Sequence, residues 1–587
     1  MLPSKTPRNL YIMKRKKILE LVMLLLAMHA AWSCGEQTQA KHTSYAFDYT
    51  EIYLPEHGSG EYDSLSLHNL DKEWGIWGHN LGQVLPEYPS QAVYAKRNGI
   101  PYREQFCFSS EELYEYIVEF IDSDYGVLSS SRFAILPNDN QITCLCPKCK
   151  AAGNSSDDAS PAVMQMIRRL AKHFPKHMFF TSHYGCVKSM PEEPMPKNVG
   201  VLVSAIDFPL SVTETDKEKE FATLLADWSQ KTHNVYVWDY INNFDDYFTP
   251  FPVFSVMERR FKLYKEVGAN GIFLNGSGED YSSLSRLKLL VLSSMLENPD
   301  TDWRKELKQK AMELYPTTGE LIYDFMMAQE NYVQKLQKEL PLYDGITTAL
   351  KTYLPREDFE EFHDALFAQC QDAAPEEQAE MEKLCKAMEL TRLELMRKDG
   401  QLEDYESRLE TLLTLDSNDD IHVYSESSWS LASYAKDYRL LAERNAQSSG
   451  NRLKGVKLQA LSTLDPEYDD LSILTDGVLG MPTNYHNGIV INSPELKWSI
   501  GVPAMPGLKT LRVWLVTNPA FRMGLPKRIN LLSGGNVLNT VEPKLSGGKV
   551  GHTFVDISVP PAGGMLTLEF ARNKEVPSMG IEEIEGF

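Results

Sequence analysis

Asn234-Val-Tyr-Val-Trp-Asp-Tyr-Ile-Asn-Asn243 is the stretch from which the fold can be predicted, because an apolar and aromatic run ends there abruptly in polar side chains. A continuous apolar run is typical of a parallel strand buried on both faces, and α/β barrels place their chemistry just past the carboxyl ends of such strands. The stretch therefore predicts a buried strand that carries Trp238, Asp239 and Tyr240 to the floor of a site. The alternative is a core tryptophan, a loop-capping aspartate and turn-forming asparagines.

Outward from this stretch, strand and helix signals alternate along the chain. Short β-branched or aromatic runs occur at residues 74–78, 133–136, 178–182, 199–206 and 271–274. Helix starts lie between them, including the capping boxes Ser109-Ser-Glu-Glu112 and Thr215 with Glu218. This alternation indicates βαβ units around a parallel sheet, so we predict a (β/α)8-type barrel, with an open doubly wound sheet as the alternative.

Other segments flank this predicted multidomain α/β core. Apolar residues recur at spacings of three and four from about Pro299 to Ala446, which predicts an α-helical domain. Alternating runs such as residues 511–516, separated by Gly, Pro and Asn turns, predict a C-terminal β-sandwich. The predicted divisions are a lipoprotein signal (1–34), a tether with an N-terminal segment (35–70), the barrel (71–298), the helical domain (299–446) and the β-sandwich (452–587).

The first 34 residues have the layout of a bacterial lipoprotein signal. Basic residues at 14–17 precede an apolar run from Ile18 to Ala31 that is too short for a comfortable membrane span. Small residues at Ala31 and Ser33 lead to Cys34, the residue that would be acylated. We therefore expect an exported protein, lipid-anchored to the outer membrane on its periplasmic or cell-surface face. An uncleaved anchor helix is the alternative.

Charge and motif content disfavour several classes of function. The formal net charge of -22 argues against nucleic acid as a partner, because phosphate contacts require clustered Lys and Arg. No Gly-x-Gly-x-x-Gly opens a predicted helix, and neither Gly-x-Ser-x-Gly nor His-Glu-x-x-His occurs. A dinucleotide site, a familiar serine hydrolase and a zinc peptidase are therefore disfavoured.

Carboxylates recur at the ends of the predicted strands. Because these ends share one edge of a parallel sheet, the acids are expected to converge there, and glycoside cleavage needs a protonated carboxylic acid paired with a carboxylate. We predict Asp139, Asp239 and Glu279 as catalytic residues, with Asp139 as the proton donor and Asp239 as its partner. This mechanism requires no cofactor, although any one acid could instead be a helix N-cap. The predicted sugar contacts are His79, Asn80, Asp207, Trp238, Tyr240, Asn242, Asn243 and Asp280.

A thiol cluster, Cys144-Leu-Cys-Pro-Lys-Cys149, begins five residues after Asp139. Its three thiols, Cys144, Cys146 and Cys149, suit a tetrahedral structural zinc if a fourth ligand comes from Cys107, His183 or Cys186. Export makes disulfides the competing interpretation, since oxidising compartments permit them. In either case the cluster is expected to hold the loop that carries Asp139.

Five motifs together resemble an exported domain-of-unknown-function family of TIM-barrel glycosidase type, related to α-glucuronidases and to the hexosaminidases of glycoside hydrolase family 20. They are Trp77-Gly-His-Asn80, Glu104-Gln-Phe-Cys-Phe-Ser109, Asn138-Asp139 ahead of the cysteines, Trp238-Asp-Tyr240 and Glu297-Asn-Pro-Asp300. The resemblance covers roughly residues 70–330 and implies a sugar-processing barrel from a glycan-degrading bacterium.

The C-terminal region resembles a second family. Leu474-Thr-Asp-Gly477, together with Trp498 and Ile581-Glu-Glu-Ile-Glu585, is similar to coagulation-factor-type discoidin jelly rolls. This resemblance implies a carbohydrate-binding accessory domain with a calcium ion near the Asp476 loop. The whole sequence thus predicts an exported lipoprotein glycoside hydrolase that acts on a complex glycan. A non-catalytic glycan-binding surface protein with the barrel as a scaffold is the alternative, since fold does not imply function.

Overall fold

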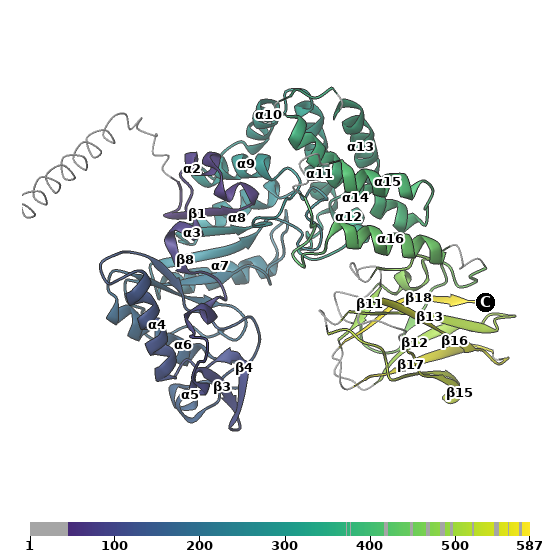
Figure 1. The fold of residues 1–587 in the computed structure, drawn as a ribbon, viewed down its shortest axis with the longest axis horizontal. Coiled ribbons are helices and arrows are strands. Elements are labelled where there is room, and N and C mark those ends of the chain that lie inside the picture. The colour runs from purple at the N-terminus through teal and green to yellow at the C-terminus, as the bar shows by residue number, and fades with distance from the viewer. Residues whose placement is uncertain are drawn as a thin grey trace, which may run out of the picture.

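The computed structural model describes residues 45–587, apart from residues 371, 376, 416–420, 446–449, 465–469, 482–487, 493–496, 519–521, 545–550, 562 and 574–577. The predicted signal with Cys34 lies outside the described residues. The described part forms a parallel β/α half-barrel, a helical region and two C-terminal antiparallel sheets, in that order along the chain (Figure 1).

Seven parallel strands form one sheet in the order β1-β9-β8-β7-β6-β5-β2. Every neighbouring pair is parallel, so all the carboxyl ends lie at one edge. The strands are β1 (Tyr49–Tyr53), β2 (Trp74–Ile76), β5 (Arg132–Ala134), β6 (Met178–His183), β7 (Val199–Ser204), β8 (Asn234–Tyr240) and β9 (Gly271–Asn275). The eight-stranded barrel expected from the sequence is therefore a seven-stranded sheet in the described residues. β1 lies within the segment expected to be a tether.

Side chains bridge β1 and β2, which have no backbone pairing in the described structure. Trp74 Nε1 donates to Tyr49 Oη at 2.9 Å, and Tyr49 Oη donates in turn to Glu51 Oε2. The backbone N–H of Leu70, just before β2, donates to Glu51 Oε1 at 2.7 Å. Glu51 is fully buried, and these donors satisfy its carboxylate where a ladder of backbone hydrogen bonds would otherwise lie.

The sheet separates two apolar cores. Its inner core takes one residue from each of the seven strands: Tyr49, Trp74, Ala134, Phe180, Leu202, Tyr236 and Phe273. In β8 the neighbouring residues Val235 and Val237 belong instead to the core on the other face, against the helices. This alternation is the period of two of a strand, and the shared inner core shows that the sheet is strongly curled.

The outer face is covered by α4 (Glu111–Asp124), α6 (Ser160–His173), α7 (Asp216–Ser229), α8 (Phe254–Glu266) and α9 (Ser285–Glu297). Helices begin at both predicted capping boxes. Thr215 Oγ1 accepts from the Glu218 N–H at 3.1 Å, whereas the N-cap of α4 is Ser110, one residue after the predicted Ser109, and its Oγ accepts from the Leu113 N–H at 3.3 Å. The connection from β2 to β5 also includes a hairpin of β3 (Tyr94–Arg97) and β4 (Ile100–Phe106). Short turns complete this part: η1 (Pro55–Gly58), α2 (Gly60–Ser64), α3 (Leu70–Glu73), η2 (Leu81–Val84), η3 (Gln91–Val93) and α5 (Pro147–Ala152).

The helical region is built from α10 (Trp303–Leu314), α11 (Gly319–Leu336), α12 (Ile346–Thr352), α13 (Arg356–Cys370), α14 (Gln378–Asp399), α15 (Tyr405–Thr414) and α16 (Leu431–Asn445). It is joined to the half-barrel through Glu330 of α11, whose buried carboxylate accepts from the first N–H groups of α8. Phe254 N donates to Oε1 at 2.8 Å and Ser255 N donates to Oε2 at 3.2 Å. Among the described helices, none is both long and apolar enough to cross a membrane.

The C-terminal region has two antiparallel sheets. One contains β10 (Gln459–Ala460), β12 (Lys497–Pro503), β17 (Met565–Ala571), β14 (Arg528–Ser533) and β15 (Asn536–Val541), and the other contains β11 (Ile489–Ile491), β18 (Met579–Gly586), β13 (Thr510–Thr517) and β16 (Gly551–Ser558). Residues of both sheets, such as Trp498 and Leu568 in the first and Leu515 and Ile581 in the second, share one apolar core. A shared core between two sheets fits the predicted β-sandwich.

Candidate functional site

The carboxyl ends of the parallel strands carry an aromatic floor. The ring of Trp77, just after β2, stacks on that of Trp238 in β8, with centroids 4.9 Å apart and planes at 19°. Phe273 of β9 packs against both rings. Trp238 Nε1 is a buried donor without a partner among the described residues. Because buried donors are nearly always hydrogen-bonded, this one is available to a ligand.

A cavity of about 870 Å³ opens beside this floor, along the gap between β1 and β2. Its volume is within the range of small-molecule sites. The lining alternates aromatic and polar groups, among them Tyr53, Trp77, His79, Arg103 and Asn138. Such a lining offers flat apolar faces together with hydrogen-bonding groups, the combination that a polyhydroxylated ring requires.

His79 and Asn80, two of the predicted sugar contacts, reach this cavity. Gly78 has a φ of +58°, which lets the chain turn sharply after β2. His79 Nδ1 lies 2.6 Å from the carbonyl oxygen of Pro137. Since a carbonyl only accepts, Nδ1 carries the hydrogen and Nε2 of the neutral ring is an acceptor. Asn80 Nδ2 donates to the Trp77 carbonyl at 3.0 Å, and the side-chain oxygen of Asn80 has no partner among the described residues.

Asp139 is exposed at the same rim, after β5, and interacts with two tyrosines. Burial, followed by the charge and a hydrogen bond of Asp139, raises the pKa of Tyr184 to about 12. Asp207, which is exposed after β7, acts more weakly on the same hydroxyl. Burial also raises the pKa of Tyr240, and the charge of Asp139 contributes. The structure thus brings together Asp139, Asp207 and Tyr240, as the sequence predicts, and adds Tyr184.

Two further groups reach the rim from the helical region. The loop after β8 is hydrogen-bonded to this region, because Phe244 N donates to Leu342 O at 2.7 Å and Glu426 N donates to Phe244 O at 2.8 Å. These bonds place Tyr343 beside Glu426, and Tyr343 Oη donates to Glu426 Oε2 at 3.1 Å. The pKa of Tyr343 is raised mainly by burial and then by Glu426, with a smaller effect of Tyr240.

Glu426 is the acidic group that sequence reasoning missed. Although the residue is exposed as a whole, protein atoms partly surround its carboxyl group, and this partial burial raises the pKa of Glu426. The charges of Asp245 and Asp139 raise it further, whereas the Tyr343 hydroxyl lowers it. The charge of Asp139 in the half-barrel thus contributes to the raised pKa of Glu426 in the helical region.

Asp239 lies elsewhere. Its neighbours Trp238 and Tyr240 face the interior and rim, so strand alternation turns Asp239 outward against α8, where it is fully buried. One carboxylate oxygen is paired with Arg260 Nη1, and the other accepts from Tyr264 Oη at 2.6 Å. The structure therefore does not bring Asp239 together with Asp139.

Asn242 and Asn243, also predicted sugar contacts, are buried in the loop after β8. Asn243 Nδ2 donates to the carbonyl of Asp344 at 2.9 Å, which ties this loop to the helical region. Asn242 Oδ1 accepts from Lys288 Nζ at 2.9 Å. Burial lowers the pKa of Lys288 to about 7. Both asparagines therefore organise the loop and do not face the cavity.

Glu279 and Asp280 follow β9 on the side of the rim near Tyr53. Burial raises the pKa of Tyr53, and the charges of Glu279, Asp71 and other acids add to this effect. Partial burial and the charge of Glu279 raise the pKa of Asp280. Asp280 also acts on Tyr247, as do Glu426 and Asp245, so it lies at the same acidic rim.

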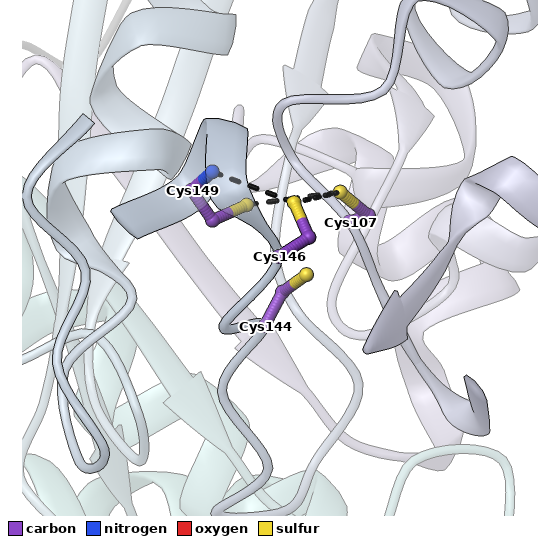
Figure 2. A group of neighbouring side chains, drawn as sticks. All are labelled: Cys107, Cys144, Cys146 and Cys149. Atoms are coloured by element: carbon purple, nitrogen blue, oxygen red, sulfur yellow. Dashed lines mark hydrogen bonds between the residues drawn. The ribbon is translucent and has the colours of Figure 1, made fainter. Parts of the chain in front are cut away.

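Four cysteines form a separate cluster (Figure 2). The sulfur atoms of Cys107, Cys144, Cys146 and Cys149 all lie within 4.8 Å of one another and could hold a metal ion. Of the three fourth ligands considered from the sequence, the structure places Cys107 in the cluster, while Cys186 and His183 lie outside it.

The Asp476 loop of the C-terminal region faces β18. Burial raises the pKa of Asp476 to about 6, and burial together with the charge of Asp476 raises the pKa of Glu583 to about 10. Glu583 Oε1 accepts from Gly477 N at 3.1 Å, whereas Oε2 is buried without a partner among the described residues. The calcium ion that the discoidin resemblance implies at this loop stays a prediction.

One protein-family model matches part of the chain. Residues 78–354 match the family model of DUF4838, a domain of unknown function. The DUF4838 match thus spans β5 to β9 and the first helices of the helical region, and it includes Asp139 and Tyr343 but not Glu426. No curated protein matches the sequence.

The solved structures that resemble this chain include glycoside hydrolases, at a distance. A GH138 enzyme targeting pectin rhamnogalacturonan II aligns with a TM-score of 0.32 and 9% identity, covering 92% of this chain and 84% of that one. CpGH84D aligns with a TM-score of 0.15 and 11% identity, covering 61% of this chain and 76% of that one. This chain thus has a distant structural resemblance to glycoside hydrolases.

Proposed function

We propose that this protein is a glycoside hydrolase that cleaves a complex glycan at the carboxyl-end rim of its β/α half-barrel. Two observations support the proposal: the rings of Trp77 and Trp238 stack at the carboxyl ends of the strands, and the charge of Asp139 contributes to the raised pKa of Glu426. Glycoside cleavage uses two carboxyl groups in different protonation states, and environments that separate their pKa values indicate their roles.

The proposed roles differ from those expected from the sequence. Partial burial and the nearby carboxylates favour the protonated form of Glu426, so Glu426 donates its proton to the glycosidic oxygen as that bond breaks. Exposed Asp139 then acts as the charged partner, either by attacking the anomeric carbon or by taking a proton from the attacking water. Trp77 and Trp238 supply faces for the sugar, and His79 Nε2 accepts from a hydroxyl. Asp239 takes no part in the chemistry.

A second candidate function is glycan binding without cleavage. The aromatic cavity along the gap between β1 and β2 favours it, because this cavity includes Trp74, Trp77 and Tyr94 but neither Asp139 nor Glu426. A glycan could occupy that surface while the two carboxyl groups stay idle. The two functions are separable, because binding then survives the loss of Asp139 and no product forms.

The test is a screen of the purified protein against aryl glycosides and against host and plant glycans, with the Asp139→Asn variant in parallel. We expect wild-type turnover of at least one substrate and a loss of about a hundredfold or more in the variant, the usual contribution of such a group. The matched control is Asp122→Asn, an exposed carboxylate on α4 away from the rim. Glycan binding by both proteins without turnover would support the second candidate.

We also propose that the C-terminal sheets form a carbohydrate-binding discoidin-like domain. A separate proposal concerns location: the protein is exported and held on the outer membrane by acylation of Cys34. The short apolar run that ends in Ala-Trp-Ser-Cys motivates the proposal of acylation at Cys34. We expect Cys34→Ser to abolish labelling by palmitate and to release the protein from membranes or leave it unprocessed. The control is Cys370→Ser, which removes a different thiol. A Cys34→Ser protein that is still labelled and still in the membrane contradicts lipidation at this residue.

A further inference from the structure

We infer that Cys107, Cys144, Cys146 and Cys149 bind one zinc ion in a closed, structural four-thiolate centre. This inference is independent of the proposed function, because it depends on sulfur geometry and not on any reaction at the rim. The ligands come from two segments. Cys107 follows β4, whereas Cys144 and Cys146 lie in the loop that leads from β5 to α5 and Cys149 lies in α5 itself.

The sulfur positions match a tetrahedral zinc site. Zinc–thiolate bonds of about 2.3 Å put the four sulfurs of a tetrahedron about 3.8 Å from one another. Cys107 Sγ lies 3.7 Å from Cys146 Sγ and 3.7 Å from Cys149 Sγ, and all four sulfurs lie within 4.8 Å (Figure 2). Three of the four residues are buried, so a bound ion would have no open position for water or substrate.

The same geometry argues against disulfides. In a disulfide the two sulfur atoms are about 2.05 Å apart, and each is bonded to only one other sulfur. Cys107 is instead equally distant from two sulfurs, and all four of these cysteines are free thiols. An arrangement in which every sulfur approaches the same point is the one that a single central cation produces.

The surrounding N–H groups suit thiolate ligands. Lys96 N donates to Cys144 Sγ at 3.3 Å, and Cys149 N donates to Cys146 Sγ at 3.4 Å. The Ser109 hydroxyl lies 3.2 Å from Cys149 Sγ, where it can donate to a thiolate. Such hydrogen bonds orient the ligands and offset the negative charge of four thiolates around a divalent ion. Soft thiolate ligands in a tetrahedron favour zinc over calcium or magnesium.

The proposed zinc fixes the segment that carries Asp139. Glu104 and Gln105, just before Cys107, clamp Asn138 and Asn140, just before Cys144. Gln105 Oε1 accepts from Asn138 N at 2.9 Å, and the Glu104 carbonyl accepts from the side-chain amides of Asn138 and Asn140, each at 2.9 Å. Zinc would join these two segments a second time, through Cys107 in one and Cys144 in the other. Loss of zinc would therefore loosen the loop that carries Asp139.

Metal content is the direct test. We expect the purified full chain, prepared without chelator, to contain about one zinc per chain by plasma mass spectrometry. Cys144→Ser and Cys149→Ser are expected to retain about a tenth of that zinc or less and to lower the melting temperature by roughly 10 °C. Cys186→Ser is the matched control, because Cys186 is a buried thiol outside the cluster, and it should keep its zinc.

A second measurement uses the wild-type protein alone and so does not depend on the variants folding. Titration with an organomercurial in the presence of a chromophoric zinc chelator should release zinc in step with the four cluster thiols. An intact mass short by two or four hydrogens, in protein that contains no metal, would show disulfides and overturn the inference. Stoichiometric iron with a visible charge-transfer band would overturn the assignment to zinc.

Discussion

Glu426→Gln is expected to lower kcat on a natural glycan by about a hundredfold to ten-thousandfold, the range for loss of a general acid. The variant removes the transferable proton but keeps the shape of the side chain and an acceptor for Tyr343. Activated aryl glycosides should be partly spared, because a good leaving group departs without protonation. Steady-state kinetics on both substrate types give this comparison, with folding checked by a thermal melt.

The pH profile distinguishes a proton donor from a residue that only positions the substrate. The pKa of Glu426 is raised, so the acid remains protonated above the ordinary range of a carboxyl group and is lost as pH rises through its folded-state pKa. The wild-type enzyme should therefore lose kcat/KM on the basic limb, and Glu426→Gln should lack that limb. Glu443→Gln, an exposed carboxylate on α16, is the control and should leave the profile unchanged. An unaltered basic limb in Glu426→Gln would remove it from the mechanism.

The largest effect on stability is expected from Asp239→Asn. This substitution leaves Arg260, which is 5% exposed, without its charged partner and weakens the hydrogen bond from Tyr264. Breaking one side of a buried ion pair typically costs about 3–5 kcal/mol of the free energy of unfolding. A fall in the urea midpoint of the half-barrel, without a matching fall in kcat per folded molecule, is the expected result.

Two further variants make this test specific. Asp207→Asn changes an exposed rim carboxylate after the neighbouring strand and should alter stability by less than about 0.5 kcal/mol. The double variant Asp239→Leu with Arg260→Met should recover much of the loss, because apolar residues often replace a buried ion pair at little cost. Wild-type stability combined with lost turnover in Asp239→Asn would instead return Asp239 to the catalytic pair.

The sequence predicts the parallel sheet well because its strong strands are apolar and its helices carry local start signals. Both strand β8 and the caps at Ser110 and Thr215 depend only on neighbouring residues. Strand β1 was not predicted because two of its buried residues, Thr50 and Glu51, have polar side chains and so interrupt the apolar pattern of a buried strand. The burial of Glu51 is made favourable by hydrogen bonds from the Tyr49 hydroxyl and the Leu70 N–H, and a sequence pattern does not show a donor as distant in the chain as Leu70.

The sequence predicts a residue of the candidate site only where the end of a single strand determines the position of that residue. His79 and Asp139 reach the rim as expected, but Asp239 does not. A signal for this existed, since a strand that turns Trp238 inward must turn the next residue outward. Glu426 carried no such signal, because it reaches the rim through backbone contacts between the helical region and the loop after β8.

The parallel pairing of β1 with β9 determines where the shortest fragment suitable for expression has to begin. A fragment cut at the limits of the DUF4838 match, residues 78–354, would discard β1 and β2 and leave the long edge of β9 bare. Unpaired strand edges recruit other chains, so such a fragment would tend to aggregate during purification. It would also lack Glu426. A soluble truncation with a complete rim has to begin before Tyr49 and continue past residue 426.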